Sequence, residues 1–429
     1  MRLPEDRLPS GRVAFAADRA PMVPAGLAAD IATVTGLSDM ARPVPHFARS
    51  AGATGASTAP APMPGTTPGS NALTGAHAVP TGSALPIALT ASPGTAQPCS
   101  AAQSAATRYG AYTPDQLASA YGLTPLYGQG RLGGGVPVAV FELETYYSSD
   151  IAAYQACMGT SASVQNVVVN PPDNAVTPYP GLETALDVET VIGLADDAPI
   201  LVYQTSADTD SSIAQGYQRI ADDDIAKAVT TSWGGCEPFT DSSLQLAEAI
   251  AFQKMASQGQ SVYAASGDTG SEDCFAYGST ALAADDPGTQ PDVTSVGGTS
   301  LTAIGPGPTE TVWNACTNAS TACAGNANGA GGGGVSATVP SPSAWQWSSG
   351  NRTVPDVAAS ADPAHGMIVF YGTWTPVGGT SAAAPLWAAL TAVVDQGCAA
   401  PLGQADPTLY RLARSSSQSF YVITTGNND

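Results

Sequence analysis

Short apolar runs alternate with longer amphipathic segments along most of this chain. Runs rich in Val, Ile and Ala predict buried strands at 136–143, 164–170, 199–205, 229–233, 261–267, 293–297 and 367–371. Segments with apolar residues at helical spacing predict helices at 113–121, 182–195, 211–226, 242–258 and 382–396. This alternation predicts an α/β fold, with a mostly parallel, roughly seven-stranded sheet that helices cover on both faces. The carboxyl ends of such strands are where active sites gather.

The first hundred residues differ in pattern from the rest. Residues 1–50 contain some apolar periodicity, which predicts a small folded piece. Residues 51–98 are mostly Ala, Gly, Pro, Ser and Thr and contain no Asp, Glu, Lys or Arg. A segment of this composition cannot bury enough apolar surface to offset its ordering entropy, so it predicts a linker. The main domain is therefore expected to be 99–429.

The charge of the chain is strongly negative. It holds 35 Asp and Glu against 14 Lys and Arg, a formal net charge of -21 at pH 7 in 429 residues. This balance argues against nucleic acid or an anionic membrane as a partner. It suits a protein that acts at acidic pH, where carboxylates lose their charge and repel one another less. No stretch approaches the ~20 apolar residues of a membrane span. The N-terminus lacks the apolar core of a signal peptide, so either the protein stays inside the cell or the chain begins downstream of its real start.

The seven cysteines predict disulfides rather than a metal site, because no pair has the CxxC spacing of zinc or thioredoxin chemistry. Cys316 and Cys323 flank a short loop that suits a local bridge. Two longer bridges, Cys236–Cys274 and Cys99–Cys157, are also predicted, with buried free thiols as the alternative. Cys398 is left without a partner.

A first candidate for chemistry is Ser381, in the string Gly378-Gly379-Thr380-Ser381-Ala382-Ala383-Ala384-Pro385. A turn of small residues leads into an apolar helix, which exposes the hydroxyl beside the N–H groups of the helix start. Those groups could stabilise an oxyanion. The alternative is an ordinary serine at a helix N-terminus, which is common.

A nucleophilic serine needs a base, and histidine supplies it poorly here. His46 and His77 precede the main domain, and His365 lies in a loop where a surface turn is the simpler interpretation. Glu183 and Asp187 are the better candidates, since their i,i+4 spacing places both carboxyls on one face of a helix that opens after Pro180. Two such carboxyls cannot both ionise easily, so they share a proton. The alternative is an acidic first turn favoured by the helix dipole.

Asp268 is a third carboxyl, in Ser266-Gly267-Asp268-Thr269-Gly270 directly after a predicted strand. Protonated in acid, it could donate a hydrogen bond to a developing oxyanion. The alternative is a turn residue, as is usual for Asp beside Gly. The run Gly331-Gly332-Gly333-Gly334 lacks the GK[ST] of a phosphate loop, and a close backbone approach to an extended peptide is one use for it.

Taken together, these strings resemble the sedolisin, or serine-carboxyl peptidase, family over residues 99–429. Five motifs occur in the family's order, namely Glu142 in VAVFEL, Glu183 and Asp187 in ETALD, Trp233 in SWGG, Asp268 in SGDTG and Ser381 in GGTSAAAP. The resemblance implies a subtilisin-like three-layer fold and an endopeptidase that is secreted and acts in acid on proteins or peptides. It also implies roles for these residues. Ser381 would be the nucleophile, Glu183 the base, Asp187 its partner and Asp268 the oxyanion-stabilising acid, with Glu142 and Trp233 as an outer proton network.

The resemblance carries expectations for both ends of the chain. Residues 1–50 look like the tail of an inhibitory propeptide, followed by the linker to be cleaved, so the chain is expected to be truncated at its N-terminus. The family's calcium site is expected to be incomplete, because Val422 stands where the first Asp ligand would be and a hard cation needs oxygen ligands. Cys398 is expected to have lost its partner with the same missing C-terminal segment. No other cofactor is implied, and a monomer is the default.

Three alternatives remain. A subtilisin-type peptidase using His365 fits poorly, because subtilisins place Asp and His well before Ser. A catalytically inactive, secreted binding protein on a peptidase fold is opposed by the intact Ser381 string and favoured by the incomplete C-terminus. The third is a truncated product that does not fold stably.

Overall fold

The structure is a computed structural model of the 429-residue chain. It describes residues 2–7, 12–19, 21–23, 26–27, 31–38, 40, 42–50, 96–169, 180–205, 209–304, 308–316, 329–342, 344–346, 350–415 and 420–429. The predicted linker at 51–98 therefore lies almost wholly outside the described residues.

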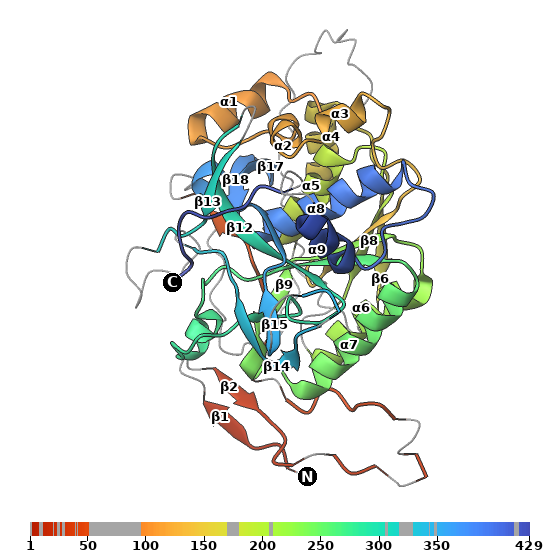
Figure 1. The fold of residues 1–429 in the computed structure, drawn as a ribbon, viewed down its shortest axis with the longest axis vertical. Helices are drawn as coiled ribbons and strands as arrows, with labels where there is room; N and C mark the ends of the chain where they lie inside the picture. The colour runs from red at the N-terminus through yellow and green to blue at the C-terminus, as the bar shows by residue number, and fades with distance from the viewer. Residues whose placement is uncertain are drawn as a thin grey trace, which may run out of the picture.

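An eight-stranded sheet forms the centre of the molecule (Figure 1). Its strand order is β13-β12-β10-β8-β5-β7-β6, and β16 pairs with β12 off this path. All its pairs are parallel except β12 with β13. The strands are β5 (Val138–Glu142), β6 (Val164–Val168), β7 (Ile200–Gln204), β8 (Ala228–Thr231), β10 (Ser261–Ala265), β12 (Thr294–Ala303), β13 (Thr309–Val312) and β16 (Val357–Ser360).

Long helices pack on both faces of this sheet, as predicted. Helices α5 (Leu182–Leu194) and α8 (Thr380–Asp395) pack against each other on one face, and α6 (Asp210–Asp223) and α7 (Ser242–Ser257) cover the other. Each face of the sheet has its own hydrophobic core. Successive residues of a strand pack into different cores, because their side chains point to opposite faces of the sheet. In β5, Val138 and Val140 pack with α5 and α8, whereas Ala139 and Phe141 pack with α6 and α7. The result is a three-layer α/β sandwich.

The smaller elements surround this sandwich. The remaining helices are α1 (Ser100–Tyr109), α2 (Pro114–Ala120), α3 (Thr124–Tyr127), α4 (Ser148–Met158) and α9 (Asp406–Ser415), with short 3₁₀ turns η1 (Glu237–Phe239), η2 (Asp273–Tyr277) and η3 (Pro363–His365). The remaining strands are β1 (Glu5–Arg7), β2 (Val13–Phe15), β3 (Val44–Pro45), β4 (Ala48–Arg49), β9 (Trp233–Cys236), β11 (Asp285–Asp286), β14 (Gly334–Pro340), β15 (Asn351–Val354), β17 (Met367–Phe370) and β18 (Trp374–Gly378). They form four small sheets, β1-β2, β11-β9-β3, β14-β15 and β17-β18-β4.

One predicted strand is not in the central sheet. The apolar run 367–371 forms β17, but this strand pairs antiparallel with β18 in a separate small sheet. Its apolar residues pack instead against the α5 and α8 core. The central sheet gains β13 and β16, which the sequence pattern did not indicate, because β13 is only partly buried and β16 is short and alanine-rich.

The N-terminal piece joins the main domain through two small sheets. The β1-β2 pair lies at the N-terminal end of the molecule in Figure 1. Further along, β3 pairs with β9, and β4 pairs with β18. Residues 42–49, called here the N-terminal segment, therefore run in extended form between two elements of the main domain.

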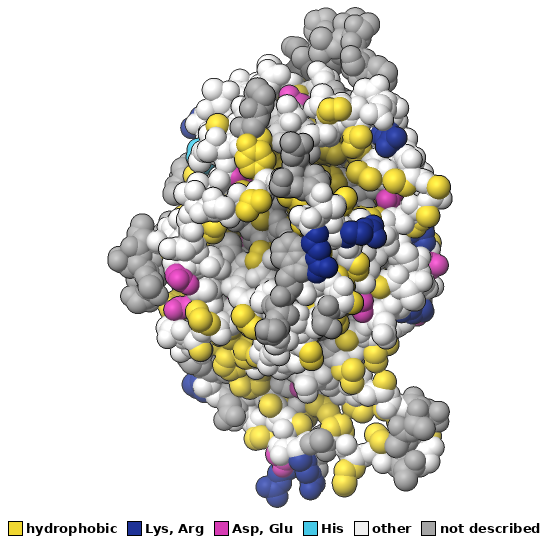
Figure 2. Space-filling view, viewed as in Figure 1, with side chains coloured by type: hydrophobic (Ala, Val, Ile, Leu, Met, Phe, Trp, Pro, Cys, Tyr) yellow, Lys and Arg dark blue, Asp and Glu magenta, His cyan; other side chains and the backbone are white. Residues whose placement is uncertain are grey.

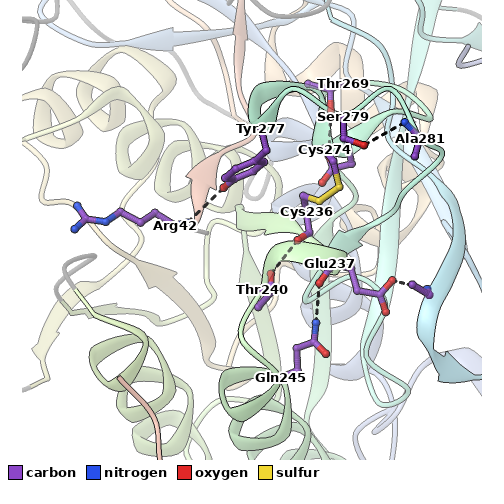
Figure 3. Close-up of a disulfide and its surroundings, with 12 residues drawn as sticks. Arg42, Cys236, Glu237, Thr240, Gln245, Thr269, Cys274, Tyr277, Ser279 and Ala281 are labelled. Atoms are coloured by element: carbon purple, nitrogen blue, oxygen red, sulfur yellow. Dashed lines mark hydrogen bonds between the residues drawn. A yellow bond between two sulfur atoms is a disulfide. The ribbon is translucent and has the colours of Figure 1, made fainter. Parts of the chain in front are cut away.

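The two predicted long bridges are present. Cys99 is bonded to Cys157, which ties the start of α1 to α4. Cys236 is bonded to Cys274, which ties β9 to η2 (Figure 3). Cys398 is an exposed free cysteine. The predicted bridge from Cys316 to Cys323 reaches a residue outside the described residues. No helix in the described part of the chain is long and apolar enough to cross a membrane.

Many carboxyl groups lie inside the molecule. The face shown in Figure 2 carries few, scattered Asp and Glu side chains, although the chain has 35. The buried ones include Glu142, Glu183, Asp187, Glu189, Asp210, Glu237, Glu248, Asp273, Asp285, Asp286, Asp395 and Asp406. Because an isolated buried carboxylate is costly, these groups must hold protons, pair with cations or accept hydrogen bonds.

Candidate active site

The candidate nucleophile is the second residue of α8. The helix begins after Gly379, whose φ of 96° is a conformation that favours glycine. A methyl group there would collide with the carbonyl oxygen of His46 and lie 2.6 Å from Asp268 Oδ2. Pro385, one turn further on, has no N–H to return to the Ser381 carbonyl. That carbonyl instead lies 3.4 Å from the Ser232 hydroxyl. The fully buried Ser381 side chain is thus held at a helix start whose turn requires glycine.

Glu183 and Asp187 lie on α5, which packs directly against α8. Both side chains are completely buried. Gly181, at the N-cap of α5, has no side chain to cap the helix, and Glu144 does so instead. Glu144 Oε1 accepts hydrogen bonds from the backbone N–H of Glu183, at 2.9 Å, and of Thr184, at 3.3 Å. The start of α5 is therefore fixed by a carboxylate from the end of β5.

Burial raises the pKa of both carboxyls of this pair. For Glu183 the further causes are the nearby charges of Asp187 and Glu142. For Asp187, the hydrogen bond from Ser232 and the nearby Glu183 carboxyl oppose the effect of burial. The Ser232 hydroxyl lies 2.8 and 2.9 Å from the two oxygens of Asp187. The Ser232 hydroxyl thus only partly offsets the effect of burial on Asp187, and the two carboxyls titrate as a unit.

The Ser381 hydroxyl lies close to Glu183. Its Oγ and both Glu183 oxygens form no hydrogen bond of ordinary geometry with any described residue. The hydroxyl is nevertheless near enough to lower the pKa of Glu183, an effect smaller than the rise from burial and the neighbouring charges. The Ser381 hydroxyl and the Glu183 carboxyl are thus neighbours inside the protein.

Asp268 contacts the start of α8 and follows the end of β10 by three residues. The backbone N–H of Thr380 donates to Asp268 Oδ1 at 2.8 Å, and the Thr380 hydroxyl does so at 2.9 Å. Asp268 Oδ2 is buried and has no partner among the described residues. Burial raises the pKa of Asp268 to about 7, against the lowering effects of His46 and the Thr380 donors. Below that pH, Asp268 holds a proton that it can donate from its free oxygen.

Glu142 and Trp233 form a second layer behind the carboxyl pair. The indole Nε1–H of Trp233 donates to Glu142 Oε2 at 2.9 Å, and the Thr184 hydroxyl donates to the same oxygen at 3.0 Å. Burial raises the pKa of Glu142, and the charge of Asp187 raises it further. This electrostatic contact links Glu142 to the α5 pair.

The structure places the N-terminal segment across this site. The His46 carbonyl oxygen accepts a hydrogen bond from the Ser381 N–H at 2.9 Å, and the His46 N–H donates to the Ser232 carbonyl at 3.1 Å. Val44 pairs with Gly234 and Pro45 with Trp233 on one side, and Ala48 pairs with Gly378 and Arg49 with Val377 on the other. An extended peptide thus crosses the site with one carbonyl at the start of α8.

The structure places the predicted residues Ser381, Glu183, Asp187 and Asp268 around the start of α8, and it brings three further residues there. Ser232 lies directly after β8, and a hydroxyl at the carboxyl end of a strand is a signal for a site residue. Glu144 follows Glu142 by two residues and caps α5. His46 precedes the main domain, and no local sequence pattern shows that this distant segment lies at the site.

Two other sequence features lie elsewhere. The His365 ring stacks near Tyr112, with centroids 6.4 Å apart, and forms no hydrogen bond with the Ser381 hydroxyl. In the glycine run, the Gly332 N–H donates to the Gly267 carbonyl at 2.7 Å, and the Gly331 N–H donates to the Trp313 carbonyl at 2.9 Å. These two glycines therefore contact the backbone of the protein itself through their N–H groups.

The position expected to hold the first calcium ligand carries an apolar side chain. Val422 is 73% exposed and offers no side-chain oxygen. The described residues contain no group of three or more His, Cys, Asp or Glu side chains placed to hold a metal ion. Calcium binds six to eight oxygen ligands, and the side chain of Val422 contributes none of them.

Comparison with known proteins identifies relatives of this chain. Residues 153–428 match the sequence profile of the Subtilase family. The chain is 38% identical to kumamolisin of Bacillus sp. (strain MN-32) over 74% of this chain and 58% of that protein, and 28% identical to xanthomonalisin of Xanthomonas sp. (strain T-22) over 76% and 43%. The chain thus spans about half the length of these curated relatives.

A solved structure shows the same fold. It is a Pseudomonas sedolisin (serine-carboxyl proteinase) complexed with two molecules of pseudo-iodotyrostatin, which aligns with a TM-score of 0.66 and 24% identity over 74% of this chain and 89% of that one. The fold is therefore subtilisin-like, as expected from the resemblance. From the matched profile, the relatives and this shared fold, the chain belongs to the subtilase family, in its sedolisin, or serine-carboxyl peptidase, branch.

Proposed function

We propose that this protein is an acid-active serine-type endopeptidase that cleaves proteins or peptides through an acyl-enzyme on Ser381. The observation that carries the proposal is the position of the His46 carbonyl. Its oxygen accepts from the Ser381 N–H at 2.9 Å, and both it and Asp268 Oδ2 lie close to where a methyl group on Gly379 would stand. A substrate carbonyl in that place would have a nucleophile, a base and two oxyanion donors around it.

The reaction would follow from this arrangement. Ser381 Oγ attacks the carbonyl carbon of the substrate while Glu183 accepts the hydroxyl proton, and Asp187 stabilises the protonated pair. The negative charge on the former carbonyl oxygen is stabilised by the Ser381 N–H and by the proton of Asp268. The C–N bond then breaks and the amine leaves with the proton from Glu183. Water attacks the resulting ester by the same route, which releases the acid and restores Ser381.

Acid activity follows from the state of Asp268. As a carboxylate, Asp268 would repel the developing oxyanion, and as a neutral acid it donates to it. With a pKa raised to about 7 by burial, Asp268 is protonated in weak acid, unlike an ordinary aspartic acid. The outer pair Glu142 and Trp233 would tune the proton balance of Glu183 and Asp187 from behind.

The N-terminal segment would act as the protein's own inhibitor. It fills the site as a substrate strand would, with the His46–Phe47 bond at Ser381. Residues 1–50 would then be propeptide, 51–98 the linker and 99–429 the peptidase domain. The two disulfides are typical of an oxidising compartment and support secretion, and we propose a monomer that needs no cofactor for the reaction.

The test compares the full chain with its Ser381→Ala variant from pH 8 to pH 3. Mass spectrometry follows loss of the N-terminal segment, and a quenched peptide reports cleavage in trans. The proposal expects the wild-type chain to be processed, with a first new N-terminus at Phe47, and to cut the peptide only in acid, while the variant does neither. If both chains are folded and inert, the protein is an inactive binding protein on a peptidase fold, and the enzyme proposal is wrong.

A further inference from the structure

The first turn of α5 is capped by a side chain from another element. Its N-cap residue, Gly181, has extended backbone angles, φ -111° and ψ 168°, but no side chain that could accept from the turn. Glu144 Oε1 accepts instead from the N–H groups of Glu183 and Thr184, the second and third residues of the helix. A methyl group on Gly181 would collide with the Glu144 carboxyl, so this carboxyl stands where an N-cap side chain would begin.

Further hydrogen bonds join the same turn to the end of β5. The Gly181 N–H donates to the Thr145 carbonyl at 2.8 Å. The Thr184 hydroxyl lies 3.0 Å from Glu142 Oε2 and 3.3 Å from the Glu144 carbonyl oxygen. Because β5 lies between β8 and β7 in the central sheet, these bonds fix the backbone of the turn relative to the sheet.

The side chain of Glu183 is not held by bonds of its own. It is completely buried, yet neither of its oxygens forms a hydrogen bond of ordinary geometry with a described residue. Asp187, by contrast, accepts from the Ser232 hydroxyl. The position of the Glu183 carboxyl therefore depends on its backbone. Because a displacement of about 1 Å can slow a reaction by about a hundredfold, whatever fixes that backbone bears on the rate.

We propose that Glu144 is a positioning residue of the peptidase, which holds the turn that carries Glu183 against β5 and so sets the distance from the Glu183 carboxyl to the Ser381 hydroxyl. This inference rests on the proposed function, because it concerns the base of the same reaction. Glu144 acts through the backbone of Glu183 and takes no proton in the reaction. A cap supplied by residue 181 itself would stabilise the helix but would not join the turn to β5.

The cap does not need a negative charge in acid. Burial raises the pKa of Glu144 to about 7, against the lowering effect of the two N–H groups that it accepts from. The ionisable groups whose pKa its charge would raise are Glu142, Glu183, Asp187 and Tyr371. Below pH 7 Glu144 is therefore mostly neutral and accepts through its carbonyl oxygen. A glutamine has the same shape and the same acceptor, so Glu144→Gln should keep the cap.

Steady-state kinetics of the full chain, processed in acid, tests the positioning role. Glu144→Ala should lower kcat for a quenched peptide at pH 4 by about tenfold or more. It should change KM by less than about twofold, since the N-terminal segment pairs with β9 and β18 and not with α5. Glu144→Gln should keep kcat within about twofold of the wild-type value.

A matched control removes a helix cap away from the site. The Thr209 hydroxyl caps α6, on the other face of the sheet, by accepting from the Ser212 N–H at 3.1 Å. Thr209→Ala should therefore leave kcat unchanged. A wild-type kcat in Glu144→Ala, or a kcat in Glu144→Gln as low as in Glu144→Ala, would overturn the proposal.

A second-site change separates positioning from helix stability. With Glu144→Ala the collision at residue 181 is gone, and the hydroxyl of Gly181→Ser can accept from the first turn as an ordinary N-cap does. In the inactive Ser381→Ala background, this double change should recover the urea midpoint that Glu144→Ala alone lowers. In the active chain it should stay at least about fivefold slower in kcat, because the new cap does not reach β5. Recovery of kcat together with stability would reduce Glu144 to a helix cap and overturn the proposal.

Hydrogen exchange tests Glu144 without turnover. In the full-length Ser381→Ala chain, Glu144→Ala should speed exchange of the Glu183 and Thr184 amides by about tenfold, whereas Glu144→Gln should leave it near the parent value. If Glu144→Ala does not fold, Glu144→Asp replaces it, because its carboxyl is one carbon short of the turn. If no chain cleaves peptide, the proposed function fails. Unchanged exchange in Glu144→Ala would overturn the role of Glu144 whether or not peptide is cleaved.

Discussion

The N–H of Ser381 donates a hydrogen bond of 2.9 Å to the carbonyl oxygen of His46, a residue 335 positions earlier in the chain. The first N–H groups of a helix have no partner within the helix, so they are free to hold an outside acceptor. Here the acceptor is a peptide carbonyl, and the hydroxyl of the same serine lies beside Glu183. Ser381 thus holds the carbonyl with its backbone N–H, and its side chain carries the proposed nucleophile.

The proposed role of Glu183 as base gives a first prediction. Glu183→Gln should lower kcat/KM by about a thousandfold or more, since an amide cannot accept the serine proton. The matched control is Glu189→Gln, on the same helix and equally buried, whose Oε2 accepts from the Phe370 N–H and does not face Ser381. Steady-state kinetics with a quenched peptide measures both variants. A comparable loss in the control would mean that α5 tolerates no such change, and Glu183 would lose its special role.

The free oxygen of Asp268 gives a second prediction. In the wild type, activity should fall as the pH rises through about 7, because Asp268 loses the proton that it donates. Asp268→Asn keeps an N–H donor at every pH, so it should be slower in acid yet lack this decline. Asp268→Ala should lose about a hundredfold or more at all pH values, as other oxyanion donors do. The check is kcat/KM from pH 3 to pH 8, and an unchanged upper limb in Asp268→Asn would assign that limb to another group.

Much of this architecture could be predicted from local pattern. The five strong helix predictions at 113–121, 182–195, 211–226, 242–258 and 382–396 correspond to α2, α5, α6, α7 and α8, each within three residues at either end. These segments have apolar periodicity over several turns, which sequence reports well. Strand 367–371 was assigned to the wrong sheet, because an apolar run does not say which partner it pairs with.

The site shows the same limit. Local features of the sequence mark four of the site residues. Small neighbouring residues and positions at the ends of predicted elements indicate Glu183, Asp187, Asp268 and Ser381. The contribution of His46 depends on β3 pairing with β9 across a separation of about 190 residues, and no short window contains that information. Glu144 was missed for a related reason, since helix caps are sought next to the helix rather than at the end of another strand.

Ser232 gives a third prediction, as a positioning residue. Its hydroxyl donates to Asp187 and so lowers the pKa of that carboxyl relative to burial alone. Ser232→Ala should raise the apparent pKa of the Glu183–Asp187 pair and move the acid limb of the kcat/KM profile to higher pH. The control is Ser266→Ala, a buried serine that bonds to the Gly332 carbonyl instead. A uniform loss of rate with no shift of the limb would reduce Ser232 to a structural role.

The buried carboxyls also make stability depend on pH. Burial raises the folded-state pKa of Asp268 and of Glu144 to about 7, well above their ordinary values. Between about pH 4 and pH 7 the folded state therefore binds more protons than the unfolded state, and the free energy of unfolding falls as the pH rises. The stabilisation from each group is complete when the pH is below its pKa in the unfolded chain. It is lost as the pH rises through the pKa of the folded state, and it amounts to about 1.4 kcal/mol for each unit by which folding raises the pKa.

For the inactive Ser381→Ala chain, urea unfolding should thus show a higher midpoint at pH 5 than at pH 8. Asp268→Asn in that background should flatten part of the slope between pH 4 and pH 7, because one of the titrating groups is gone. Asp224→Asn, at an exposed position, should leave the slope as it is. A midpoint that rises from pH 5 to pH 8 would show that the buried acids are paired with cations in the folded chain, and the assignment of Asp268 as a neutral donor would fall with it.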